Sequence, residues 1–137
     1  MKDYIAGLDV GSVSVNFVII DEEGKIVYEE DYTRHAGQPF EKARQIVKKN
    51  YATYPFSQLA VTGSNGELLS KSWKVPYFEE VIAQAKGAYH INPSIRTIID
   101  IGGMDAKFIV LDDEGQVIDF GMNSSCASGT GSFLDQQ

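Results

Sequence analysis

Apolar and polar positions alternate with a period of two along the start of the chain, and this pattern predicts β-strands. Turn residues separate the apolar runs, first at Gly11 and Ser12 and then at Glu22, Glu23 and Gly24. Because tight turns join neighbouring strands in antiparallel order, the pattern indicates a three-stranded meander with strands at residues 4–10, 13–21 and 25–33.

The spacing changes to a helical period after Pro39, and the chain then alternates between helices and strands. A helix is predicted at 39–54 by apolar residues at helical spacing, namely Phe40, Ala43, Ile46, Val47 and Tyr51. After it we expect a strand at 58–62, which a helical connection makes parallel to the meander. The later patterns predict a helix at 65–73, a strand at 75–78, a helix at 79–89 and, after a break at Asn92-Pro93-Ser94, a second meander at 95–122.

The second meander repeats the first without gaps. The stretch DVGSVSVNFVIIDEEGKIV, from Asp9, aligns with DIGGMDAKFIVLDDEGQVI, from Asp100, at a constant offset of 91 residues. Such a repeat indicates a duplicated unit. We therefore expect one domain at residues 1–93 and the truncated start of a second at 94–137, and we interpret the chain as the N-terminal part of a longer protein.

Composition and charge narrow the class of protein. Hydrophobic residues make up 43% of the chain and charged residues 23%, which is typical of a globular domain. The formal net charge of −7 argues against nucleic-acid binding. No apolar run is long enough for a membrane span, and no secretory signal is visible, so we expect a cytoplasmic protein.

The repeated Asp-x-Gly turn indicates phosphate chemistry. Glycine lets backbone N–H groups approach an anion, and an aspartate at a strand end can hold Mg²⁺ through water. We therefore expect Asp9 and Asp100 to be catalytic and to hold Mg²⁺, with two facing hairpins binding one triphosphate. Phosphate contacts are expected from Gly11, Ser12, Ser14, Gly102 and Gly103. The alternative for either hairpin alone is an ordinary tight turn.

These residues resemble the superfamily of acetate and sugar kinases, heat-shock chaperones and actin. Within it the chain is most similar to the activators of 2-hydroxyacyl-CoA dehydratases and the benzoyl-CoA reductase ATPase subunits. The resemblance covers essentially the whole chain, through GLDVGSVSVNFVIID, VTGSNG, AKGA, TIIDIGGMDAKFIVLD and NSSCASGTGSFLD. It implies an α/β fold, a ribonuclease-H-like (actin-like ATPase) domain with a mixed sheet, followed by the first part of a second such domain.

The resemblance also implies cofactors and partners. In these activators the cysteine that matches Cys126 is one of two per subunit, and a homodimer holds one [4Fe-4S] cluster. ATP with Mg²⁺ then drives transfer of an electron to a dehydratase or reductase component that carries the CoA ester. We expect no cluster in this fragment, which offers too few thiolates, and no ATPase activity from it. Without the resemblance, a lone cysteine such as Cys126 is better explained as a small buried apolar side chain than as a ligand.

Two positions depart from the family pattern, namely Asn16, where a lysine is usual, and Met104, where a glutamine is usual. Asp105 and Lys107 match the family pattern. We expect Asp105 to be a polar neighbour of the metal and Lys107 to contact a phosphate. The alternative for each is a solvated strand end. Two other functions remain open, a sugar or small-molecule kinase and a degenerate nucleotide-binding regulatory module. His35 and His90 lack metal-ligand spacing, and we expect both at the surface.

Overall fold

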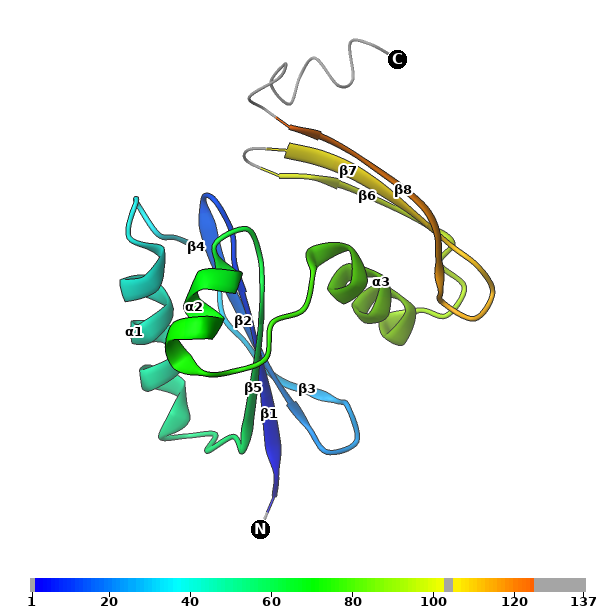
Figure 1. Ribbon diagram of the computed structural model, residues 1–137. Helices are drawn as coiled ribbons and strands as arrows, with labels where there is room; N and C mark the ends of the chain where they lie inside the picture. Colours follow the sequence, from blue (N-terminus) through cyan, green and yellow to red (C-terminus); the bar gives the residue numbers. More distant parts are fainter. Residues whose placement is uncertain (1, 103–104, 125–137) are drawn as a thin grey trace. The chain divides into compact units, whose positions relative to one another are not determined.

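The computed structural model describes residues 2–102 and 105–124, and contacts between residues divide the chain into two compact units. Unit 1 ends at Phe78 and unit 2 begins at Glu79. The strands of unit 1 are β1 (Tyr4–Val10), β2 (Ser14–Asp21), β3 (Ile26–Glu29), β4 (Thr33–Arg34) and β5 (Gln58–Thr62), and its helices are α1 (Pro39–Tyr51) and α2 (Gly66–Trp73) (Figure 1).

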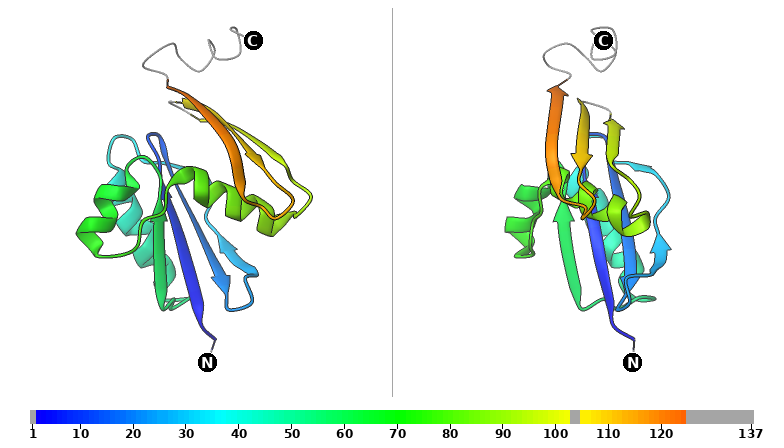
Figure 2. Two further views of the ribbon diagram at one scale, coloured as in Figure 1. Left: turned by 45° about the vertical axis from the view of Figure 1, so that its right-hand side comes forward. Right: turned by 90° about the vertical axis from the view of Figure 1, so that its right-hand side faces the viewer.

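Unit 1 is a mixed sheet with helices packed on it, as predicted, and both helices lie on one face. The strand order is β3-β2-β1-β5, with β4 also paired to β2. The meander is antiparallel, whereas β5 runs parallel to β1. Alternate residues of β1 (Ala6, Leu8 and Val10) are buried in the core with residues of α1 and α2, which lie on one side of the sheet (Figure 2). The intervening residues of β1, including Asp9, therefore face the opposite side.

The predicted strand at residues 25–33 is wrong in one respect, because the structure splits it into β3 and β4. At the break the Glu30 carboxylate accepts hydrogen bonds from Tyr28 Oη at 2.8 Å, Lys49 Nζ at 2.8 Å and Asn50 Nδ2 at 3.1 Å. Three donors stabilise this carboxylate and fix the end of α1 to the sheet. The Glu30 N–H still donates to the Phe17 carbonyl of β2 at 2.9 Å, so its side chain makes these contacts while its backbone stays beside the sheet.

The strand predicted at residues 75–78 is also wrong. This segment contributes a single bridge between Tyr77 and Val61. Val75 N–H is bonded to the Ser70 carbonyl at the end of α2, at 3.0 Å, and Pro76 has no N–H to donate to a neighbouring strand.

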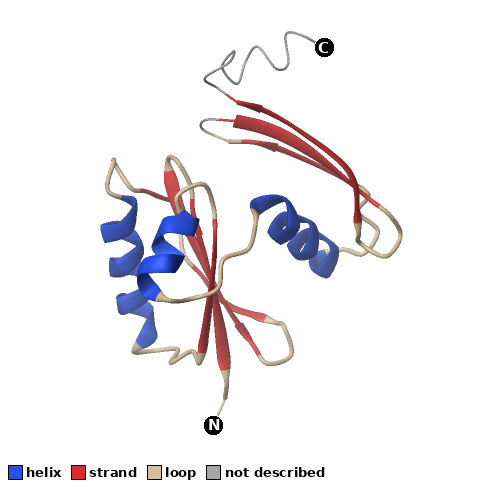
Figure 3. Cartoon of the chain, in the orientation of Figure 1, coloured by secondary structure: helices blue, strands red, loops and turns tan. Residues whose placement is uncertain are grey.

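Unit 2 contains α3 (Glu80–Ile91) and a three-stranded antiparallel sheet in the order β6-β7-β8 (Figure 3). The strands are β6 (Thr97–Ile101), β7 (Asp105–Leu111) and β8 (Val117–Ser124), so the second predicted meander is confirmed. Ala85 of α3 is buried with Ile109 and Leu111 of β7. By its contacts α3 belongs with the second sheet, although the repeat boundary predicted after residue 93 assigns it to the first domain.

The sequence repeat is also a repeat of structure. At the far end of each meander, Asp21 Oδ1 accepts hydrogen bonds from the N–H groups of Glu23 and Lys25, and Asp112 Oδ1 accepts them from Glu114 and Gln116, all at 2.9 Å. Gly24 and Gly115 have similar positive φ angles, 84° and 80°. The register shift of the first meander, between Ile19 and Ile20, recurs between Val110 and Leu111.

One difference between the copies is burial. Leu8 of β1 is 2% exposed, whereas its repeat partner Ile99 in β6 is 67% exposed. In the described part of unit 2 the only helix is α3, and it packs on the opposite face of the sheet, beside Ile98 and Ile109. Among the described residues, no helix is both long enough and apolar enough to cross a membrane.

Candidate functional site

The first Asp-x-Gly turn closes tightly between β1 and β2. Gly11 N–H donates to the Ser14 carbonyl at 3.0 Å. Asp9 is opposite Asn16 on β2 and opposite Thr62 on β5. The carboxyl ends of β1 and β5 therefore meet at this edge of the sheet, which is the edge where α/β proteins bind ligands.

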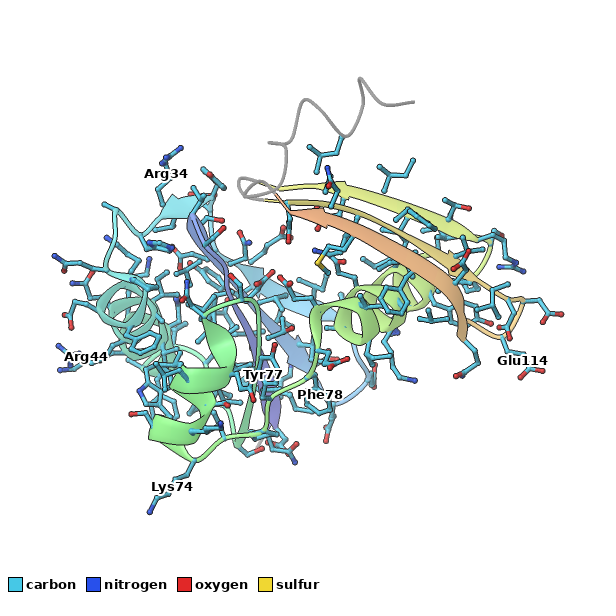
Figure 4. All side chains as sticks on the ribbon, turned by 45° about the horizontal axis from the view of Figure 1, so that its top comes forward. Arg34, Arg44, Lys74, Tyr77, Phe78 and Glu114 are labelled. Carbon is cyan, nitrogen blue, oxygen red and sulfur yellow. The ribbon has the colours of Figure 1, made fainter. Side chains whose placement is uncertain are left out.

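The loop after β5 closes around Asp9. Gly63 has a φ of 103°, and a Cβ built on it would lie 2.6 Å from Asp9 Oδ1 and 2.4 Å from the Val10 carbonyl oxygen. Asn65 N–H donates to the same Val10 carbonyl at 2.9 Å, and Tyr77 Oη, labelled in Figure 4, donates to the Gly63 carbonyl at 3.3 Å. The loop backbone can approach the carboxylate this closely only because Gly63 has no side chain.

Thr62, a neighbour of Asp9, carries a buried hydroxyl that lacks a hydrogen-bond partner among the described residues. Buried polar atoms are nearly always bonded. A hydroxyl without a partner beside a carboxylate fits a place where a ligand or its water completes the hydrogen bonding.

His35 is 6% exposed, so the prediction that it lies at the surface is wrong, whereas His90 is exposed as expected. His35 Nε2 lies 3.0 Å from the Gly11 carbonyl oxygen, and Asn65 Nδ2 donates to the same oxygen at 2.9 Å. The sequence carries no signal for His35, because it stands alone in a loop. Asn65 lies in VTGSNG, but the pattern does not show which residue it contacts.

The second Asp-x-Gly turn has the same closure. Gly102 N–H donates to the Asp105 carbonyl at 2.8 Å, as Gly11 does to Ser14. Asp100 is opposite Lys107 on β7. The Lys107 side chain is 2% exposed, and its Nζ lies 3.1 Å from Asp100 Oδ2 and 3.8 Å from Glu80 Oε2. A solvated strand end is therefore excluded for Lys107.

Gln84 of α3 completes this cluster. Its Nε2 donates to Asp100 Oδ2 at 2.8 Å, so Gln84 and Lys107 contact the same carboxylate oxygen. No hydrogen bond to Asp100 Oδ1 comes from the described residues, and Gln84 Oε1 is buried without a partner among them. One fixed carboxylate oxygen and one accepting oxygen suit a hydrated Mg²⁺, which binds proteins through few carboxylates and several waters.

The charges of this cluster are mutually stabilising. Burial raises the pKa of Asp100, but the Gln84 hydrogen bond and Lys107 outweigh it, so this pKa lies below its ordinary value of 3.8. Burial lowers the pKa of Lys107, but Asp100 and Glu80 outweigh it, so that pKa lies above 10.5. Asp100 is therefore an anion and Lys107 a cation at neutral pH.

This pair predicts a dependence of stability on pH. Because folding lowers the pKa of Asp100, its contribution to stability is present above pH 3.8 and is lost as the pH falls through the folded-state pKa. We expect Asp100→Asn to destabilise the chain by about 2 kcal/mol at pH 7. The difference from the wild type should shrink between pH 5 and 2, measured by thermal unfolding. Asp113→Asn, at an exposed turn, is the control, and a difference independent of pH would contradict the pairing.

The described residues include most of the predicted site residues, one set in unit 1 around the first turn and the other in unit 2 around the second. Ser12 is exposed at the first turn, and Ser14 and Asp105 begin β2 and β7. Gly103, Met104 and Cys126 lie outside the described residues. In residues 2–102 and 105–124, no three His, Cys, Asp or Glu side chains gather as direct metal ligands, and binding of Mg²⁺ through water does not need such a group.

Solved structures define the class of this fold. The match to the (R)-2-hydroxyglutaryl-CoA dehydratase component A of Acidaminococcus fermentans has a TM-score of 0.79 at 30% identity, covering 97% of this chain and 52% of that chain. The match to the activator of 2-hydroxyisocaproyl-CoA dehydratase from Clostridium difficile, solved with bound ADPNP, has a TM-score of 0.72 at 32% identity. It covers 97% of this chain and 50% of that chain. The chain thus has the actin-like ATPase fold, in mixed α/β form.

The sequence comparisons agree with this class. The chain belongs to the BadF/BadG/BcrA/BcrD ATPase family, whose model matches residues 6–136. It is 39% identical over 139 residues to the activator of lactoyl-CoA dehydratase from Anaerotignum propionicum, covering 96% of this chain and 51% of that relative. The chain spans about half the length of the curated relatives that it matches.

Proposed function

We propose that this chain is the N-terminal part of an ATP-dependent activator that transfers an electron from a [4Fe-4S] cluster to a 2-hydroxyacyl-CoA dehydratase or a related CoA-ester reductase. The observation that carries the proposal is the pair of Asp-x-Gly turns with the same closure, Gly11 to Ser14 and Gly102 to Asp105, in a chain of this ATPase family. The relatives named as dehydratase activators favour this function over a sugar kinase.

The two turns supply backbone N–H donors and aspartates, the groups that bind a nucleoside triphosphate and its Mg²⁺. The backbone N–H groups of Ser12 and Gly103 are proposed to bind phosphate oxygens. Gly11 and Gly102 close the turns through their own N–H groups, and with no side chain they are proposed to let the phosphate approach the backbone. Asp9 and Asp100 would each hold the water shell of Mg²⁺, which neutralises phosphate charge when bound.

The residues around Asp100 have distinct proposed roles. Lys107 and Gln84 both contact Oδ2, so they hold the Asp100 carboxylate with its other oxygen available to water. We propose that the Lys107 ammonium also favours phosphate binding through its positive charge. Asp105, whose carbonyl closes the turn, is proposed as a polar neighbour of the metal, and Ser14 takes the equivalent place in the first turn.

Cys126 is proposed as a ligand of the cluster, which supplies one-electron chemistry when bound. It follows the end of β8 at Ser124 by two residues, in the Cys-Ala-Ser-Gly-Thr-Gly stretch of the family pattern. A homodimer of the complete protein is proposed to share the cluster, and the dehydratase or reductase component that carries the CoA ester is the proposed partner.

Two measurements on the protein expressed from its complete reading frame test this proposal. Anaerobic purification should give about two irons per chain, as one [4Fe-4S] cluster shared by two subunits requires. Cys126→Ser should lose the iron but keep the fold. Iron-free protein that still hydrolyses ATP would favour a kinase, and protein with neither property would favour a regulatory module.

A further inference from the structure

The tip of the first phosphate turn is held from behind by two side chains from other parts of unit 1. The Gly11 carbonyl oxygen accepts hydrogen bonds from His35 Nε2 and from Asn65 Nδ2. His35 follows β4, and Asn65 immediately precedes α2. Because a carbonyl oxygen has two lone pairs, the two donors satisfy it completely.

The hydrogen bonds of His35 define its tautomer. Gly37 N–H donates to His35 Nδ1 at 3.2 Å, so Nδ1 is the acceptor and Nε2 carries the proton that it donates to Gly11. The ring is buried, whereas the side chain of the preceding residue, Arg34, extends outward (Figure 4). A neutral imidazole is therefore part of the support beneath the turn.

Peptide geometry connects this support to the phosphate side of the turn. The bond between Gly11 and Ser12 is trans, so its C=O and N–H point in opposite directions. Fixing the carbonyl toward His35 and Asn65 aims the Ser12 N–H away from them. Within the described residues nothing accepts a hydrogen bond from this N–H, which leaves it available to an anion.

We propose that His35 and Asn65 are positioning residues for phosphate binding at the first turn, an inference that rests on the proposed function. They bind no ligand themselves. They hold the Gly11–Ser12 peptide in the orientation that presents the Ser12 N–H, and so they place a donor in advance of nucleotide binding.

Two substitutions of His35 separate its two hydrogen bonds. The amide of His35→Gln can replace Nε2 and donate to Gly11, whereas the amide oxygen of His35→Asn can replace Nδ1 and accept from Gly37. Both lose one bond from a buried site, so comparable losses of thermal stability are expected. Asn65→Ala is a third variant, and it removes little else because this side chain makes no capping bond to α2.

The variants are compared in the complete protein by ATP affinity and by hydrogen exchange without nucleotide. We expect His35→Asn and Asn65→Ala to bind ATP roughly fivefold to tenfold more weakly and His35→Gln to stay within about twofold. Hydrogen exchange of the Gly11 N–H should accelerate in His35→Asn and Asn65→Ala but not in His35→Gln. Equal losses of affinity in both His35 variants, or unchanged exchange in all three, would overturn the positioning role. If the wild type itself fails to bind ATP, the proposed function fails, and exchange still decides the role of His35 and Asn65.

Discussion

Substitution of Gly63 by alanine is expected to destabilise unit 1 by about 3 kcal/mol or more and to abolish nucleotide binding. Alanine at a φ of 103° is strained, and its Cβ would collide with the Val10 carbonyl oxygen at 2.4 Å and Asp9 Oδ1 at 2.6 Å. The Val10 carbonyl is backbone and cannot rotate away as a side chain can, so the loop or β1 must move. Thermal unfolding and ATP titration of the complete protein measure the two effects.

Gly37→Ala is the matched control for this prediction. Gly37 also has a positive φ, 80°, but a Cβ there would meet nothing within 4 Å. It should therefore show only the conformational penalty, about 1–2 kcal/mol, with ATP affinity largely kept. If Gly63→Ala lowered thermal stability and ATP affinity no more than Gly37→Ala does, the close approach of the loop backbone to Asp9 would contribute to neither.

Much of the fold could be predicted from the sequence because it depends on local signals. The bounds of β1 and β5 are as predicted, and the repeat correctly anticipates two meanders with equivalent turns. The failures come from tertiary contacts. At the break between β3 and β4, Glu30 contacts Lys49 and Asn50 of α1, and no pattern within residues 25–33 reveals that contact.

In the candidate site, likewise, some residues could be predicted from the sequence and others are known only from the fold. The two aspartates and their glycines stand out in the sequence because turn chemistry requires them at fixed spacing. The partners that orient them are distant in sequence, as with Gln84 for Asp100 and Gly63 for Asp9. Lys107 was expected from its match to the family pattern, but its burial beside Asp100 and Glu80 follows from the packing of α3 against β7.

The two turn aspartates should be needed for ATP hydrolysis in the complete protein. Asp9→Asn and Asp100→Asn keep the shape of the side chain but remove the charge that is proposed to hold hydrated Mg²⁺. We expect each to lower kcat for ATP hydrolysis by roughly 10²–10³, the loss typical of one preorganised electrostatic group. Steady-state phosphate release with saturating Mg²⁺ and ATP measures this effect.

The repeat supplies matched controls for these two substitutions. Asp21 and Asp112 are also repeated, but they lie at the ends of β2 and β7 that are far from the Asp-x-Gly turns. Each accepts hydrogen bonds from backbone N–H groups there. Asparagine can accept the same bonds, so Asp21→Asn and Asp112→Asn should change kcat by less than about twofold. The Asp100 variant should also lose stability through Lys107, so the ATPase assay is run at a temperature where all four variants remain folded. Full turnover by either Asp9→Asn or Asp100→Asn under those conditions would remove that aspartate from the catalytic site.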